Sequence, residues 1–288
     1  MLFDLRSPGR RNLIRVVYAG LAVLMGGGLI FFGIGGSGGG LFSDVGGGGG
    51  GGDGNPFEDQ ISDAEAKLQQ NPQDTAALAE LVQLHYQAGS NQIDVDQDTG
   101  TQSLTEEGEQ QLAESADAWD RYLKQTQKSG AQPATGVSSI AVQTFSVLAD
   151  ASFSQALDAT GTEALDRAND AVTSWTDAAE AQRILAEAQP AGQAFANLAF
   201  FLYRSGDIAG GDRASAQAAQ AAAPSEKASI EQQLKQTKKQ GEQLTQAIAQ
   251  LQKQQEQTTQ ATGGATGANP LESLGGGGLS TGGGLSGQ

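Results

Sequence analysis

The sequence contains no cysteine and a single histidine, His85. Without cysteine, the chain cannot form a disulfide, a thiolate nucleophile, a cysteine metal site or a lipid anchor on a processed cysteine. Without a second histidine, we expect neither a catalytic triad nor a transition-metal site. His85 recurs with apolar residues on one face of a predicted helix, so we interpret it as a packing residue rather than a catalytic one.

Two further signatures of enzymes are missing. The glycine runs lack the Gly-Lys-Ser/Thr ending of a phosphate-binding loop, and no predicted strand precedes them. The carboxylates are numerous but scattered over polar helix faces, and no two of them are singled out as an acid–base pair. We therefore predict no catalytic residues, no cofactor and no enzymatic activity.

Positive charge is scarce, because 17 Lys and Arg stand against 33 Asp and Glu for a formal net charge of −16. A surface this acidic repels nucleic acid and anionic lipid headgroups, so neither is an expected partner. Runs of β-branched residues are also few, whereas alanine, glutamine and leucine are abundant, as they are in helices. The composition predicts an all-α protein.

One long hydrophobic run lies near the start of the chain. Residues 16–36 contain no charged side chain, and a helix of this length crosses roughly 30 Å of hydrocarbon at about 1.5 Å per residue. Because positive charge is retained in the cytoplasm, the basic residues 1–15 predict an N-terminus inside the cell and the remaining chain outside the cytoplasmic membrane. The arginines responsible are Arg6, Arg10, Arg11 and Arg15.

The alternative for this run is a cleaved signal peptide. The apolar stretch is longer than the core of a usual signal peptide, and no clear cleavage site follows it. We therefore favour a retained single transmembrane helix.

Glycine-rich segments lie on both sides of the remaining chain. Residues 37–55 predict a flexible tether, and residues 259–288 predict a disordered tail. Within the tail, Leu271, Leu274 and Leu279 form a candidate short docking motif.

Residues 56–224 carry apolar side chains at helical spacing. Asp74 or Thr75, and later Thr105, are candidate N-caps, and the intervening stretch Gln92–Leu104 is polar and rich in turn residues. The predicted helices are Phe57–Gln70, one from Asp74 or Thr75 to Gly89, Thr105–Gln127, Val137–Leu157, Thr162–Ala188, Ala194–Arg204 and Ser215–Ala223.

The segments Asn71–Ser90 and Gln189–Asp207 resemble the first helix of a tetratricopeptide repeat. In that family a proline precedes a helix with a large residue, a Leu-Gly pair and aromatic residues, and Gly-Asp follows it. The usual tryptophan and glycine are replaced here by Leu78 and Val82. The matching positions are Pro72, Leu78, Leu81-Val82, His85-Tyr86 and Gly89-Ser90 in the first copy, and Pro190, Phe195, Leu198-Ala199, Leu202-Tyr203 and Gly206-Asp207 in the second.

The resemblance implies an α-solenoid of about three helix pairs over residues 56–224. In such a stack the small residues Ala199 and Ala218 let paired helices approach, and the tryptophans Trp119 and Trp175 pack inward. With its anchor and tether, the chain resembles the membrane-anchored tetratricopeptide proteins of high-GC Gram-positive bacteria. Its layout is also similar to that of the ancillary translocon subunits of Gram-negative inner membranes.

One stretch resembles the start of a calcium loop. Asp94, Asp96 and Asp98 alternate as the first three ligands of such a loop do, but the glycine comes one position late and Thr105 stands where the final glutamate is required. We therefore favour a turn at Asp98–Gly100 and predict no metal site.

Residues 225–258 predict one long helix. Its apolar seam contains Ile230, Leu234, Leu244, Ile248 and Leu251 at heptad spacing, and Thr237 and Gly241 interrupt it. We expect Ile230 and Leu234 to cover the open end of the repeat stack while the glutamine-rich remainder projects into water. Weak self-association through the seam is the alternative.

Two functions remain open. In the first, the chain is a scaffold or a chaperone-like accessory factor for envelope or secretion machinery, and its repeat groove takes an extended segment or a helix of another protein. In the second, it is a structural spacer of the envelope that self-associates through the long C-terminal helix.

Overall fold

The computed structural model describes residues 57–95, 102–260, 269–271 and 274 of the chain. The chain divides into two units, Met1–Gly52 and Asp53–Gln288, and every described residue belongs to the second unit. The predicted transmembrane helix (16–36), the arginines before it and the tether (37–55) lie outside the described residues. Within the described part of the chain, no helix is long and apolar enough to cross a membrane.

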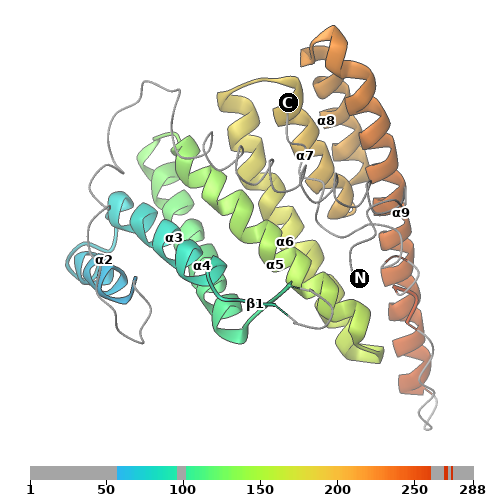
Figure 1. Cartoon of the computed structure of the whole chain (residues 1–288), viewed down its shortest axis with the longest axis horizontal. Coiled ribbons are helices and arrows are strands. Elements are labelled where there is room, and N and C mark those ends of the chain that lie inside the picture. The colour runs from blue at the N-terminus through green and yellow to red at the C-terminus, as the bar shows by residue number, and fades with distance from the viewer. Residues whose placement is uncertain (1–56, 96–101, 261–268, 272–273, 275–288) are drawn as a thin grey trace, which may run out of the picture. The chain divides into compact units, whose positions relative to one another are not determined.

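The described residues are almost entirely helical, as the composition predicts, and the all-α class is confirmed. The helices follow one another in chain order from α2 at one end to α9 at the other (Figure 1). They are α2 (Glu58–Gln70), α3 (Thr75–Ser90), α4 (Glu106–Ser129), α5 (Thr135–Asp158), α6 (Gly161–Ala188), α7 (Gly192–Arg204), α8 (Ile208–Ala221) and α9 (Pro224–Gln260).

Side-chain caps fix two of the helix starts at the predicted residues. The carboxylate of Asp74 accepts hydrogen bonds from the backbone N–H groups of Ala76 and Ala77 at 3.0 and 3.1 Å. The hydroxyl of Thr105 accepts a hydrogen bond from the N–H of Gly108 at 3.0 Å. These bonds satisfy backbone donors that the first turn of a helix leaves without partners.

The connection between α3 and α4 differs from the predicted loop. Two short strands, β1 (Ile93–Val95) and β2 (Gln102–Leu104), pair antiparallel, and Ile93 lies opposite Leu104. The ladder continues into α4 because Thr105 N–H donates to the carbonyl of Gln92 at 3.1 Å. The β-branched residues Ile93 and Val95 alternate, which favours a strand. The stretch was predicted as a loop because its other residues are mostly polar.

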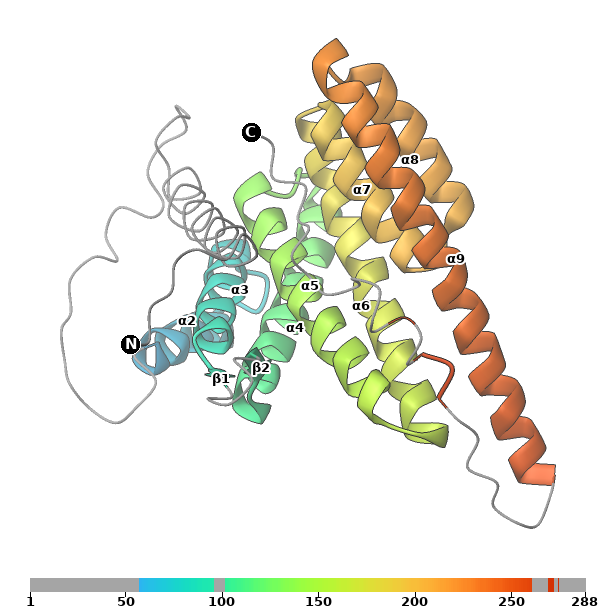
Figure 2. The same cartoon turned by 45° about the vertical axis from the view of Figure 1, so that its right-hand side comes forward.

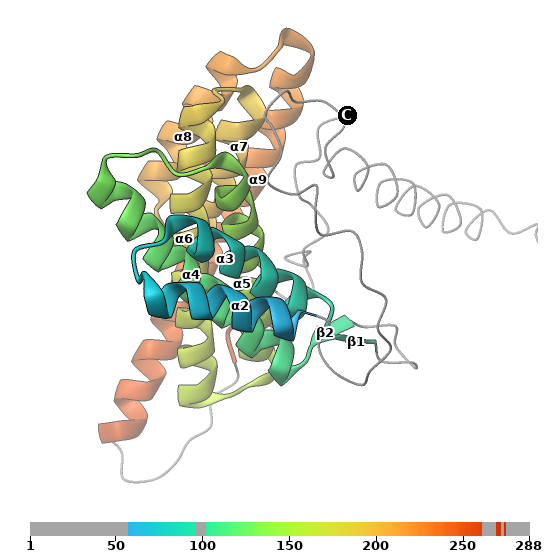
Figure 3. The ribbon, with the colours of Figure 1, turned by 90° about the vertical axis from the view of Figure 1, so that its left-hand side faces the viewer.

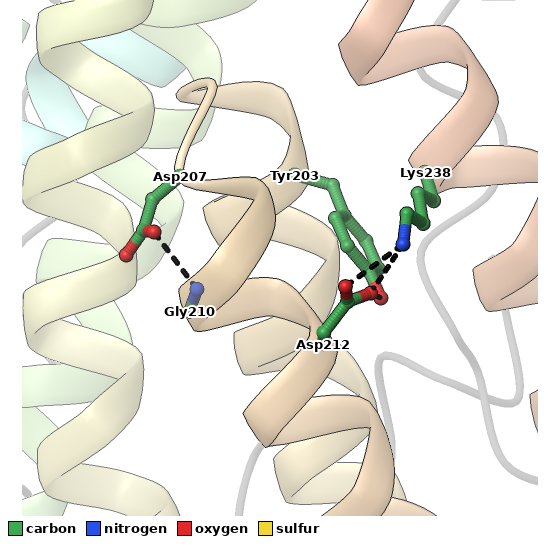
Figure 4. A network of polar contacts seen from close by, with 5 residues as sticks. All are labelled: Tyr203, Asp207, Gly210, Asp212 and Lys238. Atoms are coloured by element: carbon green, nitrogen blue, oxygen red, sulfur yellow. Dashed lines mark hydrogen bonds and ion pairs between the residues drawn. The ribbon is translucent and has the colours of Figure 1, made fainter.

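The helix α8 is longer than predicted, because it begins at Ile208 rather than at Ser215. Its N-cap is Asp207, which accepts a hydrogen bond from Gly210 N–H at 2.8 Å (Figure 4). The adjacent Gly211 lies directly against the ring of Tyr203, and a Cβ there would collide with the ring. Both glycines therefore belong to the helix: Gly211 lets α8 approach α7 closely, and Gly210 leaves room for the side chain of the N-cap Asp207.

The helices pack as neighbouring pairs. The pairs α3 with α4, α5 with α6 and α7 with α8 lie side by side, and α2 packs on α3 at the far end (Figures 2 and 3). Contacts of α4 with α5 and of α6 with α7 join one pair to the next. The core between them is rich in alanine, and its two tryptophans, Trp119 and Trp175, are 2% and 1% exposed.

The long helix α9 packs against α6, α7 and α8. Its residues Ile230 and Leu234 are buried, as expected for a capping helix. The expectation that the rest of the helix projects into water is wrong, because Leu244, Ala247 and Leu251 are buried as well.

Two residues of α9 that interrupt the apolar seam contribute to this packing. The hydroxyl of Thr237 donates to the carbonyl of Gln233 at 3.1 Å, so that it is buried with its hydrogen bond made. Gly241 lies against the carbonyl of Tyr203, where a larger residue would collide. Of the two predicted interruptions, Gly241 is therefore a point of close approach to α7, and Thr237 is a buried residue whose hydroxyl bonds within α9.

A polar network at the surface joins α7, α8 and α9 (Figure 4). Asp212 of α8 accepts hydrogen bonds from the Tyr203 hydroxyl of α7 at 2.9 Å and from the Lys238 ammonium of α9 at 2.8 Å. Both donors hold the pKa of Asp212 below its usual value, with Lys238 as the larger influence. Because the ion pair is exposed, its contribution to stability is small, and the network mainly fixes the position of α9.

Candidate protein-interaction site

The residues that carry the tetratricopeptide resemblance lie mostly in the helix contacts. His85 is 7% exposed, and its Nδ1 lies 2.8 Å from Gln111 Oε1 of α4, so it joins α3 to α4. Gly89 provides a close approach, since a Cβ there would lie 2.7 Å from the carbonyl oxygen of Gly108. Leu78, Leu81, Trp119, Trp175, Leu198, Ala199, Tyr203 and Ala218 are buried, Tyr86, Phe195 and Gly206 are half-buried, and Pro72 and Pro190 are exposed.

A buried polar contact fixes how α3, α4 and α5 meet. The hydroxyl of Ser115 on α4 donates to the carbonyl of Val82 on α3 at 2.8 Å and lies 3.1 Å from the hydroxyl of Thr144 on α5. Both hydroxyl-bearing residues are 0% exposed. Since a buried hydroxyl without a partner is destabilising, this contact favours one register of the three helices over others.

The first helices of the three pairs, α3, α5 and α7, are linked to one another. The hydroxyl of Tyr86 on α3 donates to Oε1 of Gln143 on α5 at 2.8 Å. Further along α5, Asp150 forms an ion pair with Arg204 at the end of α7, with 3.7 Å between Oδ1 and Nη1. We call the surface formed by Tyr86, Gln143, Asp150, Phe200 and Arg204 the first-helix face.

Aromatic rings enclose the cation of the first-helix face. The guanidinium carbon of Arg204 lies 5.1 Å from the ring centre of Trp175 and 4.9 Å from that of Phe200, which are cation–π distances. The residue is only 4% exposed, and burial lowers the pKa of its guanidinium while Asp150 raises it. Arg204 is too deep to contact a partner directly, so it positions the half-buried Phe200 and Asp150.

Burial also changes the pKa of Asp150, the carboxyl group of this ion pair. It raises the pKa of Asp150 to about 7, although the nearby Arg204 acts in the opposite direction. Because the 3.7 Å contact is longer than a hydrogen bond, the attraction offsets only part of the loss of hydration. Asp150 therefore changes charge near neutral pH.

A second carboxyl group with a raised pKa lies on α6, among the second helices of the pairs. Burial raises the pKa of Asp177 to about 6, and the negative charges of Asp120 and Glu180 add to this effect. Its neighbours are acidic, whereas the first-helix face combines one acid, one base and aromatic rings. Aromatic residues contribute strongly to protein interfaces, and Tyr86 and Phe200 are half-buried on this face, so the first-helix face is the stronger candidate for a binding surface.

Apart from Tyr86, which was predicted as a repeat position, the residues of the first-helix face were missed in the sequence, although a signal for two of them was present. Arg204 is the one charged residue of α7, and the only charged residues of α5 are Asp150 and Asp158. Lone charges in two otherwise apolar helices indicate a buried or half-buried pair, because the hydration that each charge loses needs a partner to offset it. For Tyr86 and Gln143, no pattern in the sequence indicates that they meet.

The predicted calcium residues are mostly outside the described part of the chain. Asp96 and Asp98 are not described, and Asp94 lies in β1 opposite Ser103. Among the described residues, no group of three histidine, cysteine, aspartate or glutamate side chains is placed to hold a metal ion.

Comparison with known proteins adds no further assignment. No protein-family model matches the sequence, and neither a curated protein nor a solved structure matches the chain.

Proposed function

We propose that the chain is a membrane-anchored protein-interaction module resembling the tetratricopeptide proteins. In this proposal it acts outside the cytoplasmic membrane as a scaffold or a chaperone-like accessory factor for envelope or secretion machinery. It binds a peptide or a helix of another protein, and it neither catalyses a reaction nor needs a cofactor.

The linked first-helix face is the observation that supports this function best. In stacked helix pairs, the first helix of each pair contributes to one continuous surface, and such surfaces bind extended segments or helices. Here Tyr86 with Gln143 and Asp150 with Arg204 join α3, α5 and α7 in this way. Polar contacts among these buried and half-buried side chains hold the surface in one shape, which lowers the entropy lost on binding.

The packing of the outer two pairs supports the tetratricopeptide part of the proposal. In α3, Leu78 and Val82 are fully buried, as the family requires of its large residue and of the position after its leucine. Ala199 of α7 and Ala218 of α8 are also fully buried. Small residues at these two positions are what the family uses to bring paired helices together.

The anchor is the basis for the proposed location. Four arginines before residue 16 favour a cytoplasmic N-terminus, and the acidic helical part then lies on the other side of the membrane. A module held at the membrane in this way meets proteins that are inserted, exported or assembled there.

The spacer function has less support. It requires the apolar seam of α9 to pair with a second copy, yet Ile230, Leu234, Leu244 and Leu251 are 4%, 2%, 2% and 2% exposed within one chain. Pairing through this seam would first have to separate α9 from α6, α7 and α8.

Site-specific crosslinking in membranes tests the proposed function. A photoreactive residue is placed in the full-length chain at Gln83, Ser146 or Asn197, which are half-buried and lie one helical turn from Tyr86, Gln143 and Phe200. The matched control positions are Lys124, Arg183 and Gln217, which are exposed on the second helices α4, α6 and α8.

We expect crosslinks to the same envelope or secretion protein from the first set and none to that protein from the control set. Equal crosslinking from both sets, or crosslinking from the control set alone, would contradict binding at the first-helix face. A deletion of residues 225–288 is unsuitable for this test, because it would uncover the apolar surfaces of α6, α7 and α8.

A further inference from the structure

A short segment of the tail is packed against the helical unit. Asn269 is 5% exposed, and its Nδ2 donates to the carbonyls of Ala156 at 2.8 Å and Ala159 at 2.9 Å. The carbonyl of Leu157 lies 3.4 Å from the same nitrogen. All three carbonyls belong to the C-terminal end of α5, more than a hundred residues earlier in the chain.

The end of α5 is a natural acceptor for such a donor. The last carbonyls of a helix have no partners within the helix, and the negative end of its dipole favours hydrogen-bond donors. The C-cap of α5 is Ala159, whose side chain has no polar atom. The amide of Asn269 therefore provides the cap that the local sequence lacks.

The segment is also ordered by bonds of its own. The N–H of Leu271 donates to Oδ1 of Asn269 at 3.0 Å, which forms a turn across Pro270. A second turn follows, in which Leu274 N–H donates to the carbonyl of Leu271 at 2.8 Å. Leu271 is 0% exposed and Leu274 is 8% exposed, so both leucines join the core.

These features match the pattern of a short recognition motif. The amide of Asn269 donates to backbone carbonyls, and the turn at Pro270 orients the segment. Leu271 and Leu274, three residues apart, provide the apolar contact. The sequence on both sides of the motif is rich in glycine and contributes no large apolar residue between Leu251 and Leu271.

We propose that the C-terminal end of α5 is a peptide-binding site for segments of the form Asn-Pro-Leu-x-x-Leu, and that the chain's own Asn269–Leu274 occupies it as a tethered ligand. Eight residues, 261–268, join α9 to the motif. A tether this short gives the motif an effective concentration on the order of millimolar, so a competing peptide in solution binds more weakly to the intact chain. The site is separate from the first-helix face and does not depend on the proposed function.

Peptide binding to the purified full-length chain in detergent tests this proposal. The probe is a fluorescent peptide of residues 266–277, TGANPLESLGGG. Its anisotropy is measured with the wild-type chain and with a chain carrying Asn269→Asp and Leu271→Ser, which empties the site without changing α5. The control chain carries Leu279→Ser, a change in the same tail outside the motif.

We expect the peptide to bind the doubly substituted chain at least about tenfold more tightly than the wild-type or Leu279→Ser chain. An unlabelled wild-type peptide competes, and a peptide with Asn269→Asp does not. Equal binding to all three chains, or competition that is independent of Asn269, overturns the proposal.

A second form of the chain keeps the proposal testable if the doubly substituted chain does not fold. A protease site inserted between Gly264 and Ala265 is cleaved after folding, so that the unaltered motif becomes a separate peptide. We expect the labelled peptide to replace it after dilution, and a failure of the labelled peptide to bind overturns the proposal. Because no envelope protein is present, this result is independent of the crosslinking test.

Discussion

Asp150 and Arg204 place opposite charges inside two apolar helices, α5 and α7. The ion pair is 3.7 Å long, and burial opposes the charged form of both residues. The rings of Trp175 and Phe200 beside the guanidinium provide a further favourable contact. The cluster is therefore a weakly stabilising but specific connection between the second and third helix pairs.

This cluster predicts a pH dependence of stability. The pKa of Asp150 is raised from 3.8 to about 7 in the folded chain, so between these values the folded state binds the proton more tightly than the unfolded state. The free energy of unfolding consequently falls as pH rises from about 4 to 7, by on the order of 1–4 kcal/mol. We expect Asp150→Asn to flatten this part of the curve in denaturant unfolding measured at several pH values.

The matched comparison is Asp177→Asn. Because the pKa of Asp177 is raised only to about 6, this substitution flattens the curve below about pH 6 and leaves the decline between pH 6 and 7 in place. If Asp150→Asn retains the wild-type slope between pH 6 and 7, then Asp150 does not titrate as the structure indicates.

Single residues were predictable from the sequence where packing sets their role. His85 was expected to pack and is 7% exposed, and Asp74 and Thr105 cap the helices that they precede. The contacts of Asp150 with Arg204 and of Tyr86 with Gln143 were not predictable. They depend on how the helix pairs stack, and the spacing of apolar residues within one helix contains no information on this.

At the scale of helices, α9 shows how a seam with interruptions can still be buried. Residues at heptad spacing from Ile230 to Leu251 face α6, α7 and α8, and Gly241 meets the carbonyl of Tyr203 in the middle. A coiled coil would need a large apolar residue at that position, whereas packing on α7 needs the absence of a side chain.

We therefore expect Gly241→Ala to destabilise the chain. A Cβ at this position collides with the backbone of Tyr203, and overpacking of this kind lowers the free energy of unfolding by about 1–3 kcal/mol. The control is Gly136→Ala in the first turn of α5, where nothing lies within 4 Å of the added atom. There the same substitution raises stability by about 0.4–1 kcal/mol.

Thermal unfolding of the full-length chain and the two variants measures both effects. An increase in the melting temperature for Gly241→Ala similar to that for Gly136→Ala would show that α9 does not approach α7 closely.

The helices were predicted well where the spacing of apolar residues is regular. The predicted helix boundaries were wrong where glycine or polar residues dominate the sequence. The start of α8 was placed seven residues late, because Gly210 and Gly211 resemble a turn in sequence but lie inside the helix. The strands β1 and β2 were read as a loop for the corresponding reason, since their aspartate, glutamine and serine residues resemble turn residues.

At the scale of the whole chain, two surfaces of the helical unit are candidates for binding. The first-helix face extends over α3, α5 and α7, and the end of α5 holds Asn269–Leu274. The helix α5 contributes to both surfaces, and it packs mainly against its pair partner α6, with further contacts to α3 and α4.

The architecture was partly predictable from the sequence. The all-α class followed from composition, and the capping role of α9 followed from Ile230 and Leu234. The tail motif was proposed from three leucines, of which Leu271 and Leu274 are buried and Leu279 lies outside the described residues. Asn269 was missed, because its role depends on the distant end of α5.

The proposed function is tested most directly by determining the side of the membrane on which the helical unit lies. The chain contains no cysteine, so a single Ser154→Cys on the exposed surface of α5, or a single Ser7→Cys before the hydrophobic run, gives one labelling site. Protoplasts that contain each full-length variant are treated with a maleimide that does not cross membranes, before and after permeabilisation.

If the helical unit lies outside the cytoplasmic membrane, Ser154→Cys is labelled in intact protoplasts and Ser7→Cys is labelled only after permeabilisation. Labelling of Ser154→Cys only after permeabilisation would place the helical unit in the cytoplasm and contradict the proposed function.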